Sequence, residues 1–567
     1  MFNSLPQDSR DYIDWTWEQI APYYAELVER PLNEANVVDW LADRARINYL
    51  VEDIYNRLYV AITLDTTDET AEARYNRFNE TVLPQAQIAD QALKQKLLAS
   101  GIEPANYAIE LRAIRTEAEL FREQNVPLFV EENKLRNEYD KIAGAQTVMW
   151  NGEEKTVAQM RPLYQEADRA VREQAWRLVA ERQLTDRAAF NDLWVRMLTL
   201  RRQIAQNADL PDYRAFTWRS LQRFDYAPED CFAFHRAIEE TVVPAASRLY
   251  EKRRQRLGVE TLRPWDLDVE PAGRPPLRPF QQVSTLIETS AQIFHQVDAQ
   301  LGRYYDTMRQ EALLDLENRK GKAPGGYCTS FPVSQRPFIF MNAVGLHDDI
   351  QTLLHEGGHA FHVFEAAKLP IHRQRAAPIE FCEVASMSME LLAAPYLAAE
   401  NGGFYQMEEA HRARVEHLER MIQFWPYMAV VDAFQHWVYT HVDDALNPDN
   451  CDAVWAEQWD RFMKGIDYSG LEEIKATGWH RKLHIFQIPF YYVEYGLAQL
   501  GAAQVWRNAL NDPATATAAY RAALALGGTV PLPALFSAAG AKFAFDTATL
   551  GEAVNLIERT ITQLDPA

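Results

Sequence analysis

The sequence has little cysteine, no long hydrophobic run and no targeting pattern. Its 567 residues contain four cysteines, Cys231, Cys328, Cys382 and Cys451, which lie far apart and form no CxxC pair. This disfavours a disulfide framework and favours a reducing compartment. No run of about 18 apolar residues occurs, and the N-terminal stretch MFNSLPQDSRDYIDW lacks the basic-then-apolar order of a secretory signal. We therefore expect a cytoplasmic protein without a transmembrane helix.

Positive charge is also scarce. Lysine and arginine number 58 against 80 aspartate and glutamate residues, which gives a formal net charge of −22. Such an excess of negative charge disfavours a nucleic-acid backbone or an anionic membrane as the main partner. An acidic cleft that receives cationic peptides would also fit this charge. The hydrophobic content of 47% and charged content of 24% are those of an ordinary soluble globular protein.

Helical periodicity dominates the chain. Residues 10 to about 205 repeat apolar positions at spacings of three and four, and helix returns from residue 347 onward. Between them lie a proline-rich stretch at 259–280 and an irregular zone at 318–345, where FIFMN has the composition of a short strand. The prediction is a mainly α protein with a small β-sheet near residues 325–342. We divide it into an N-terminal helical domain, 1–200, and a catalytic domain, 201–567.

The stretch LLHEGGHAFH carries three of the thirteen histidines. On a helix at about 347–367, His355, His359 and His362 form one stripe, and Glu356 lies beside it, because each residue turns the helix by roughly 100°. Two imidazoles one turn apart can bind one zinc ion, and the intervening glutamate can reach a water on that ion. The pattern HExxH therefore predicts a metal site with Glu356 as general base, which needs a third protein ligand.

The next helix supplies candidates for that ligand. It is predicted to start at Pro378, and Glu380, Glu383 and Glu390 lie on one of its faces among apolar residues. Buried carboxylates favour a cation as partner, whereas three glutamates on a solvated face would need none. The spacing alone does not say which of the three is the ligand.

These motifs, taken together, resemble the thimet oligopeptidase and oligoendopeptidase F family of zinc metallopeptidases. The resemblance rests on HEGGHAFH followed by EFCEVAS, and on RKGKAPGGYC, PFIFMN, RFDYAPED, PWDL and HIFQIPFYYVEYGLA in the same order. It looks most like the oligoendopeptidase F branch over roughly residues 200–500. It implies an elongated, two-lobed helical fold with a deep central channel and one Zn2+ per chain.

The same resemblance assigns roles to single residues. It makes Glu383 the third zinc ligand with Glu380 as its neighbour, and His362 is interpreted as a further residue beside the metal. It also implies that His484, Tyr491 and Tyr495 reach the reaction intermediate. Tyr492 is an adjacent competitor, and an aromatic stripe packed into the core is the alternative. We expect His480 not to take part.

The strand and the loop before it are candidates for substrate binding. An extended peptide can pair with an exposed strand edge through main-chain hydrogen bonds, which tolerates many side chains. We therefore name Gly325, Gly326, Tyr327, Phe338 and Phe340 as substrate-binding candidates, with GKAPGG as a mobile loop. A phosphate-binding loop is excluded because GxxxxGK[ST] does not occur there. A purely supporting hairpin is the alternative.

The predicted function is zinc-dependent endopeptidase action on short unfolded oligopeptides. Three alternatives stay open, a dipeptidyl carboxypeptidase with the same metal site, a non-catalytic, metal-binding helical scaffold, and a chance motif that binds no metal. The glycines of the motif add a packing prediction. Gly357 points toward the apolar back of the helix, whereas Gly358 flanks the histidine stripe and leaves room for the Glu383 helix. Cleavage preference, peptide length, oligomeric state and the native divalent metal are not given by the sequence.

Overall fold

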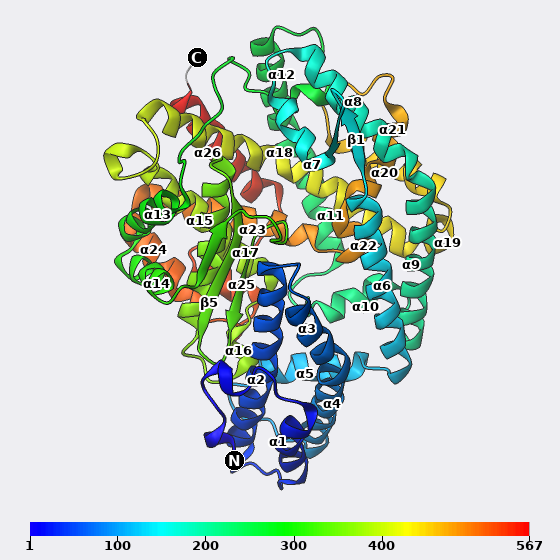
Figure 1. Ribbon diagram of the computed structural model, residues 1–567, viewed down its shortest axis with the longest axis vertical. Coiled ribbons are helices and arrows are strands. Elements are labelled where there is room, and N and C mark those ends of the chain that lie inside the picture. The colour runs from blue at the N-terminus through cyan, green and yellow to red at the C-terminus, as the bar shows by residue number, and fades with distance from the viewer. Residues whose placement is uncertain (566–567) are drawn as a thin grey trace. The chain divides into compact units, whose positions relative to one another are not determined.

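The computed structural model describes residues 1–565 and divides the chain into two compact units. Unit 1 comprises residues 1–118, 277–414 and 498–543, and unit 2 comprises 119–276, 415–497 and 544–567. Each unit is therefore assembled from three separate segments. The boundary expected at residue 200 falls inside the continuous helix α9 (Arg187–Asn207), within unit 2. The predicted fold class, mainly α with a small sheet, is confirmed (Figure 1).

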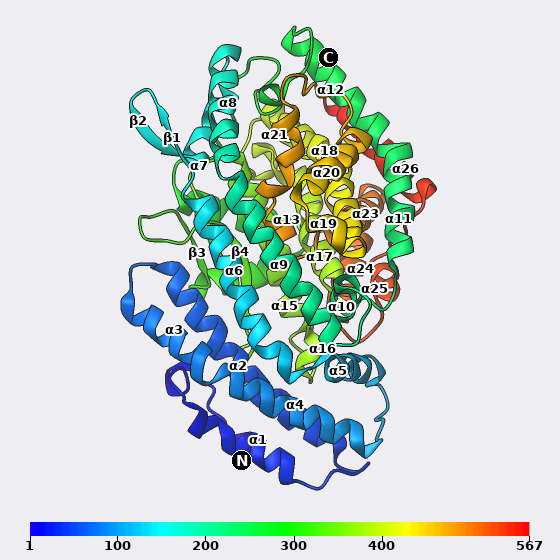
Figure 2. The same cartoon turned by 90° about the vertical axis from the view of Figure 1, so that its right-hand side faces the viewer.

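Unit 1 holds an N-terminal group of helices, a sheet and the helices around it. Its helices are α1 (Trp17–Glu29), α2 (Val37–Leu64), α3 (Glu69–Thr81), α4 (Leu83–Ser100), α13 (Val283–Val297), α14 (Ala299–Gln310), α15 (His347–Ala366), α16 (His372–Arg375), α17 (Ile379–Ala393), α24 (Pro513–Leu524) and α25 (Leu532–Ala538). Helices α1 to α4 lie side by side (Figure 2). Trp40, Ile47 and Ile54 of α2 are fully buried between them, as the apolar spacing predicts.

Unit 2 is built almost entirely from helices. These are α6 (Val126–Gly144), α7 (Val157–Met160), α8 (Arg169–Thr185), α9, α10 (Tyr213–Ser220), α11 (Pro228–Ala237), α12 (Val243–Leu257), α19 (Val442–Ala445), α20 (Pro448–Phe462), α21 (Glu472–Ala476), α22 (Leu483–Gln487) and α26 (Thr547–Leu564). A hairpin of β1 (Thr147–Trp150) and β2 (Glu153–Thr156) adds the only strands that the described part of this unit contains. The chain passes between units within α5 (Ala108–Leu120), α18 (Met407–Thr440) and α23 (Tyr492–Asn511).

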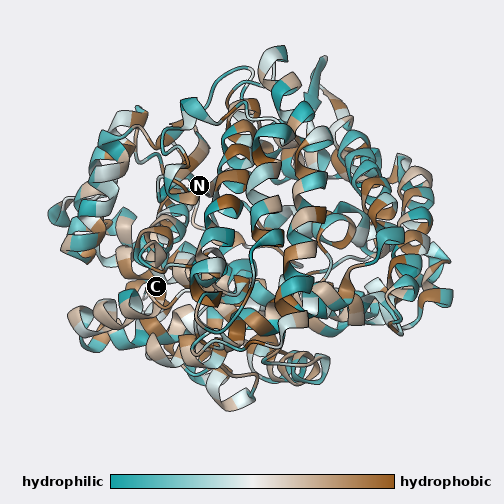
Figure 3. Ribbon diagram, turned by 90° about the horizontal axis from the view of Figure 1, so that it is seen from below, coloured by the Kyte–Doolittle hydropathy of each residue, from teal (hydrophilic) through white to brown (hydrophobic). Residues whose placement is uncertain are grey.

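Hydrophobic and hydrophilic residues alternate around the individual helices (Figure 3). This is the pattern of amphipathic helices that bury one face. None of the helices in the described range 1–565 is long and apolar enough to cross a membrane.

The sheet of unit 1 has the strand order β3-β5-β4. Strand β5 (Arg336–Ala343) pairs in parallel with β3 (Leu314–Glu317) and antiparallel with β4 (Tyr327–Phe331). The FIFMN strand is therefore central, and the expectation that it offers an exposed edge to a peptide is wrong. Its near-continuous run of buried residues has the character of a strand covered on both faces.

Candidate metal centre

Helix α15 begins at a firmly held N-terminus. One carboxylate oxygen of Asp349 accepts hydrogen bonds from the backbone N–H groups of Val344, Gly345 and Leu346, each at 2.8 Å. These bonds join the end of β5 to the first turn of the helix. An acidic group in the first turn also suits the positive end of the helix dipole. The HEGGH sequence therefore lies on a helix whose start is anchored to the sheet.

Three donor atoms converge between α15 and α17. Nε2 of His355 lies 3.3 Å from Oε2 of Glu383, and Nε2 of His359 lies 3.7 Å from the same oxygen. Ligands at zinc–nitrogen and zinc–oxygen distances of about 2.0–2.1 Å are separated by about 3.3 Å in a tetrahedral site. The chemistry and spacing of these three residues therefore fit a zinc ion.

Close packing of the two helices brings Glu383 into place. A Cβ atom on Gly358 would lie 2.6 Å from the carbonyl oxygen of Ala385 and 2.6 Å from Cα of Ser386, both in the backbone of α17. Only a glycine permits this approach. The same Ala385 carbonyl accepts a hydrogen bond from the Tyr520 hydroxyl of α24 at 2.8 Å. The predicted role of Gly358, to admit the helix that carries Glu383, agrees with this contact.

Gly357 faces a side chain rather than a backbone. A Cβ atom there would lie 2.8 Å from the tip of the Phe294 ring, which packs against Phe361 of the same helix and Tyr305 of α14. The two neighbouring glycines therefore lie on different faces of α15, as the sequence indicates: Gly358 packs against the backbone of α17 and Gly357 against the Phe294 ring.

Glu390 holds one of the histidines in position. Its Oε1 lies 2.7 Å from Nδ1 of His355, so the ring is fixed with Nε2 directed toward Glu383. Sequence reasoning placed Glu390 on the correct face but gave it no role. The available signal was its spacing of seven residues from Glu383, which returns to the same side of a helix. Glu380 is buried, and its predicted role beside Glu383 stays a prediction.

Burial and neighbouring charges shift the pKa values of the site. Burial would lower the pKa of His355, but hydrogen bonds to Glu383 and Glu390 raise it well above its ordinary value. Burial lowers the pKa of His359 to about 4, so its imidazole is neutral, as a metal ligand must be. Burial, reinforced by the charge of Glu383, raises the pKa of Glu356 to about 7. A carboxyl group near neutrality suits a general base.

Glu356 lies against the sheet. The backbone N–H of Cys328 in β4 lies near its carboxylate and opposes part of the rise in its pKa. His362 is buried one turn beyond His359, with its ring centroid 6.1 Å from that of Phe381, and it is outside the group of three converging donors. Among the described residues its Nε2 has no hydrogen-bond partner. Its predicted role beside the metal stays a prediction.

The loop expected to be mobile is held by many contacts. The buried Nζ of Lys322 lies 2.5 Å from Oδ1 of Asp315 and donates to the carbonyl groups of Asp315, Glu317 and Met341. The N–H of Ala323 donates to the carbonyl of Thr63 in α2 at 2.9 Å. Residues 321–323 are therefore fixed to the sheet and to α2.

The remaining substrate-binding candidates lie in or beside the sheet. Phe338 and Phe340 are buried, and the Tyr327 ring stacks on Phe340 at 4.9 Å while its hydroxyl bonds Thr63. Gly325 and Gly326 precede β4, the edge strand. Of the five candidates, the two phenylalanines are thus core residues of the central strand, which argues against direct contact with a substrate.

His484, Tyr491 and Tyr495, the residues predicted to reach the reaction intermediate, form an aromatic cluster in unit 2. His484 lies in the short helix α22 rather than in irregular chain, and its ring centroid is 6.0 Å from Tyr491 and 6.2 Å from Tyr495. These three side chains are half-buried, whereas Tyr492 is 5% exposed beneath the ammonium group of Lys482. Burial lowers the pKa of His484 to about 4. The cluster thus contains three half-buried polar side chains, whereas Tyr492 is a buried packing residue.

His480 is a buried residue of unit 2. Its Nε2 bonds Oδ1 of Asn191 at 2.8 Å, and its buried ring stacks on Phe190. This arrangement agrees with the expectation that it takes no part in the chemistry.

Comparison with known proteins places these features in context. The sequence profile described as peptidase family M3 matches residues 163–554. The solved structure of PZ peptidase A with an inhibitor is 27% identical, covers 100% of both chains and has a TM-score of 0.88. A protein assigned as an oligoendopeptidase F is 28% identical over 100% of this chain and 99% of its own, also with a TM-score of 0.88.

A third structure, assigned as an oligoendopeptidase F from Bacillus anthracis str. Ames, shares the fold with a TM-score of 0.84 at 24% identity, covering 99% of both chains. A comparison with curated protein sequences gives no match.

Proposed function

The chain belongs to peptidase family M3, and we propose that it is a zinc-dependent endopeptidase that hydrolyses short, unfolded oligopeptides. The observation that carries the proposal is the convergence of His355, His359 and Glu383 beside the buried carboxyl group of Glu356. The similarity to PZ peptidase A and to an oligoendopeptidase F supports the substrate class.

His355, His359 and Glu383 would hold the metal, with Glu390 orienting His355. A zinc ion at this position supplies a Lewis acid that lowers the pKa of a bound water and polarises the peptide carbonyl. Glu356 accepts the proton of the attacking water and delivers it to the nitrogen of the leaving amine. Its pKa near 7 allows both protonation states during one turnover.

Hydrogen-bond donors stabilise the negative charge that develops on the attacked carbonyl oxygen. We propose His484, Tyr491 and Tyr495 for this role, because they present half-buried polar groups in one cluster. Tyr492 is excluded from it by burial.

For the peptide itself, the edge strand β4 replaces the central strand as the proposed pairing partner. Its residue Cys328 directs its backbone N–H to Glu356, so a peptide extended along this edge would lie beside the general base. Main-chain pairing of this kind accepts many sequences.

The decisive experiment is Glu356→Gln. We expect kcat to fall by about 10²–10⁴-fold, while the zinc content of the purified chain stays that of the wild type. Hydrolysis at the wild-type rate in this variant would contradict the mechanism.

Peptide products separate the proposed activity from its nearest rival. An endopeptidase cuts a peptide whose C-terminus is amidated as well as one whose C-terminus is free. If only the free peptide is cut, and only two residues from its end, the activity is that of a dipeptidyl carboxypeptidase.

A further inference from the structure

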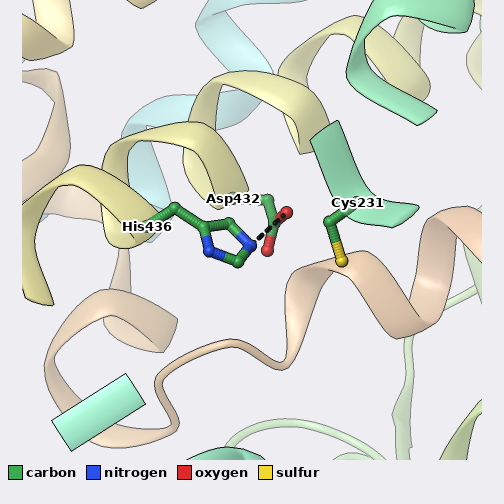
Figure 4. Close-up of side chains that lie close together, drawn as sticks. All are labelled: Cys231, Asp432 and His436. Carbon is green, nitrogen blue, oxygen red and sulfur yellow. Dashed lines mark ion pairs between the residues drawn. The ribbon is translucent and has the colours of Figure 1, made fainter. Parts of the chain in front are cut away.

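A second group of metal-binding side chains lies in unit 2, between α11 and α18. Helix α11 carries Cys231 and His235, and α18 carries Asp432 and His436. In each helix the two residues are four positions apart, so both point from one face. Figure 4 shows Cys231 of α11 beside Asp432 and His436 of α18.

The donor atoms of this group are close together and buried. The Sγ of Cys231, an oxygen of Asp432 and a ring nitrogen of His436 all lie within 4.8 Å of one another. Cys231 and Asp432 are 0% exposed, and His436 is 2% exposed. A carboxylate so far from water requires a cation or a full set of hydrogen bonds.

The hydrogen bonds of the group are incomplete. Nε2 of His436 lies 3.3 Å from Oδ2 of Asp432, yet this nitrogen has no partner in hydrogen-bond geometry among the described residues, and neither has Oδ1 of Asp432. The 3.3 Å separation equals that between His355 and Glu383 at the catalytic centre. The buried Oδ1 of Asp432 therefore has no hydrogen-bond partner among the described residues, and the contact of Oδ2 with His436 is an ion pair that a bound cation could replace.

His235 completes the surroundings of the carboxylate. Its Nε2 lies 2.8 Å from Oδ2 of Asp432, and its side chain is also buried. Ligating carboxylates commonly receive such a hydrogen bond from an outer partner, which fixes their orientation. His235 therefore suits the role of positioning residue for Asp432.

We propose that Cys231, Asp432 and His436 bind a structural transition-metal ion of the zinc type, which links α11 to α18. Thiolate and imidazole donors select zinc and its neighbours over calcium or magnesium. The site shares no residue with those proposed for the peptidase reaction, whose metal ligands belong to unit 1. The competing arrangement is a metal-free network, in which Arg214 donates to Nδ1 of His436 at 3.4 Å.

The test counts metal in the full chain after equilibration with zinc. Four proteins are compared: the wild type, His359→Ala, Cys231→Ser and Cys451→Ser. His359→Ala lacks a proposed ligand of the catalytic centre. Cys451→Ser is a matched control, because Cys451 is also 0% exposed in unit 2 but bonds the Ala445 carbonyl. We expect two ions in the wild type and in Cys451→Ser, and one in each of the other two.

Cobalt supplies a second readout that requires no change at Cys231. The His359→Ala chain loaded with Co2+ should show an intense thiolate-to-cobalt charge-transfer band, since the catalytic centre contains no sulfur. The band should disappear in His359→Ala combined with Cys231→Ser and persist when Cys451→Ser is used instead. The presence or absence of this band in His359→Ala tests the second metal site even where Cys231→Ser fails to fold.

The outcomes separate the two sites. One ion in the wild type that is lost in His359→Ala, with no thiolate band, overturns the second site and establishes the metal-free network. One ion that is retained in His359→Ala and lost in Cys231→Ser supports the second site and contradicts the proposed catalytic one.

Discussion

Nδ1 of His355 lies 2.7 Å from Oε1 of Glu390, two turns along α17 from Glu383. Helix α17 therefore carries both Glu383, a proposed ligand, and Glu390, which orients the proposed ligand His355. An outer partner of this kind fixes the ring and raises the basicity of the coordinating nitrogen.

Glu390→Gln should weaken zinc binding by about 10–100-fold, because an amide cannot hold the His355 ring as an ionised acceptor does. Competition with a chelator measures the affinity. Glu400→Gln, on the exposed side of the same unit, is the control and should match the wild type. Equal zinc affinity in all three proteins would show that Glu390 does not contribute to metal binding.

Gly358→Ala should damage the metal centre although it adds a single methyl group. The new Cβ would meet the backbone of α17, which cannot move without displacing Glu383. We expect the free energy of unfolding to fall by about 1–3 kcal/mol and zinc affinity to fall with it. Denaturant titration and zinc competition measure the two quantities.

Gly357→Ala is the matched control for that change. Its methyl group meets only the tip of the Phe294 ring, and alanine gains about 1 kcal/mol of helix propensity. Zinc affinity should therefore stay close to that of the wild type. A larger loss of zinc in Gly357→Ala than in Gly358→Ala would reverse the assignment of the two glycines.

Tyr495→Phe should lower kcat by about 10²–10³-fold and leave KM nearly unchanged, because the hydroxyl acts on charge that develops only in the transition state. Tyr492→Phe serves as the neighbouring control, since that side chain is buried beneath Lys482. Steady-state kinetics on one peptide compare the two. A greater loss of kcat in Tyr492→Phe would shift the role to the buried tyrosine.

Lys322→Met should destabilise unit 1 by about 1–3 kcal/mol, since Asp315 keeps its pair with Arg319. It leaves the Asp315 carboxylate and several carbonyl groups without the ammonium that they share. Lys320→Met, an exposed change in the same segment, is expected to have little effect. Equal stability of the two variants in denaturant would show that the contacts of Lys322 do not hold the loop.

The same ion pair gives a pH dependence. Burial would raise the pKa of Asp315, but hydrogen bonds from Arg319 and Lys322 outweigh it and hold the pKa below its ordinary value. A depressed pKa contributes stability above the unfolded value of about 3.9, and that contribution is lost as the pH falls. The difference in stability between the wild type and Asp315→Asn should therefore shrink between neutral pH and about pH 3.

The two proposed histidine ligands and the proposed general base could be predicted together from the sequence because their geometry is local. His355, His359 and Glu356 belong to one helix, and the helical turn alone places them. The choice of Glu383 over Glu380 and Glu390 depends on how α17 crosses α15, which spacing does not contain. The family resemblance supplied that choice, and the distances to His355 and His359 agree with it.

The position of the FIFMN strand could not be predicted in the same way. Composition identified a strand but not its neighbours, and the pairing with β3 involves residues 314–317, where no strand was predicted. The sequence did contain a signal for a central strand, the uninterrupted apolar run PFIFM, whose residues are buried in β5. The group in unit 2 escaped notice for a similar reason, since Cys231 and Asp432 are distant in sequence and meet only through packing.

The contact of Tyr520 with Ala385 has a consequence for how the protein is made. The metal ligands end at Glu383, whereas the hydroxyl group behind them comes from α24, in the last segment of unit 1. Domains generally fold as units during synthesis. A nascent chain that ends after α17 thus contains all three proposed ligands but lacks the helix whose Tyr520 bonds the backbone of α17. We therefore expect the proposed metal site to reach its final form only after α24 has been synthesised.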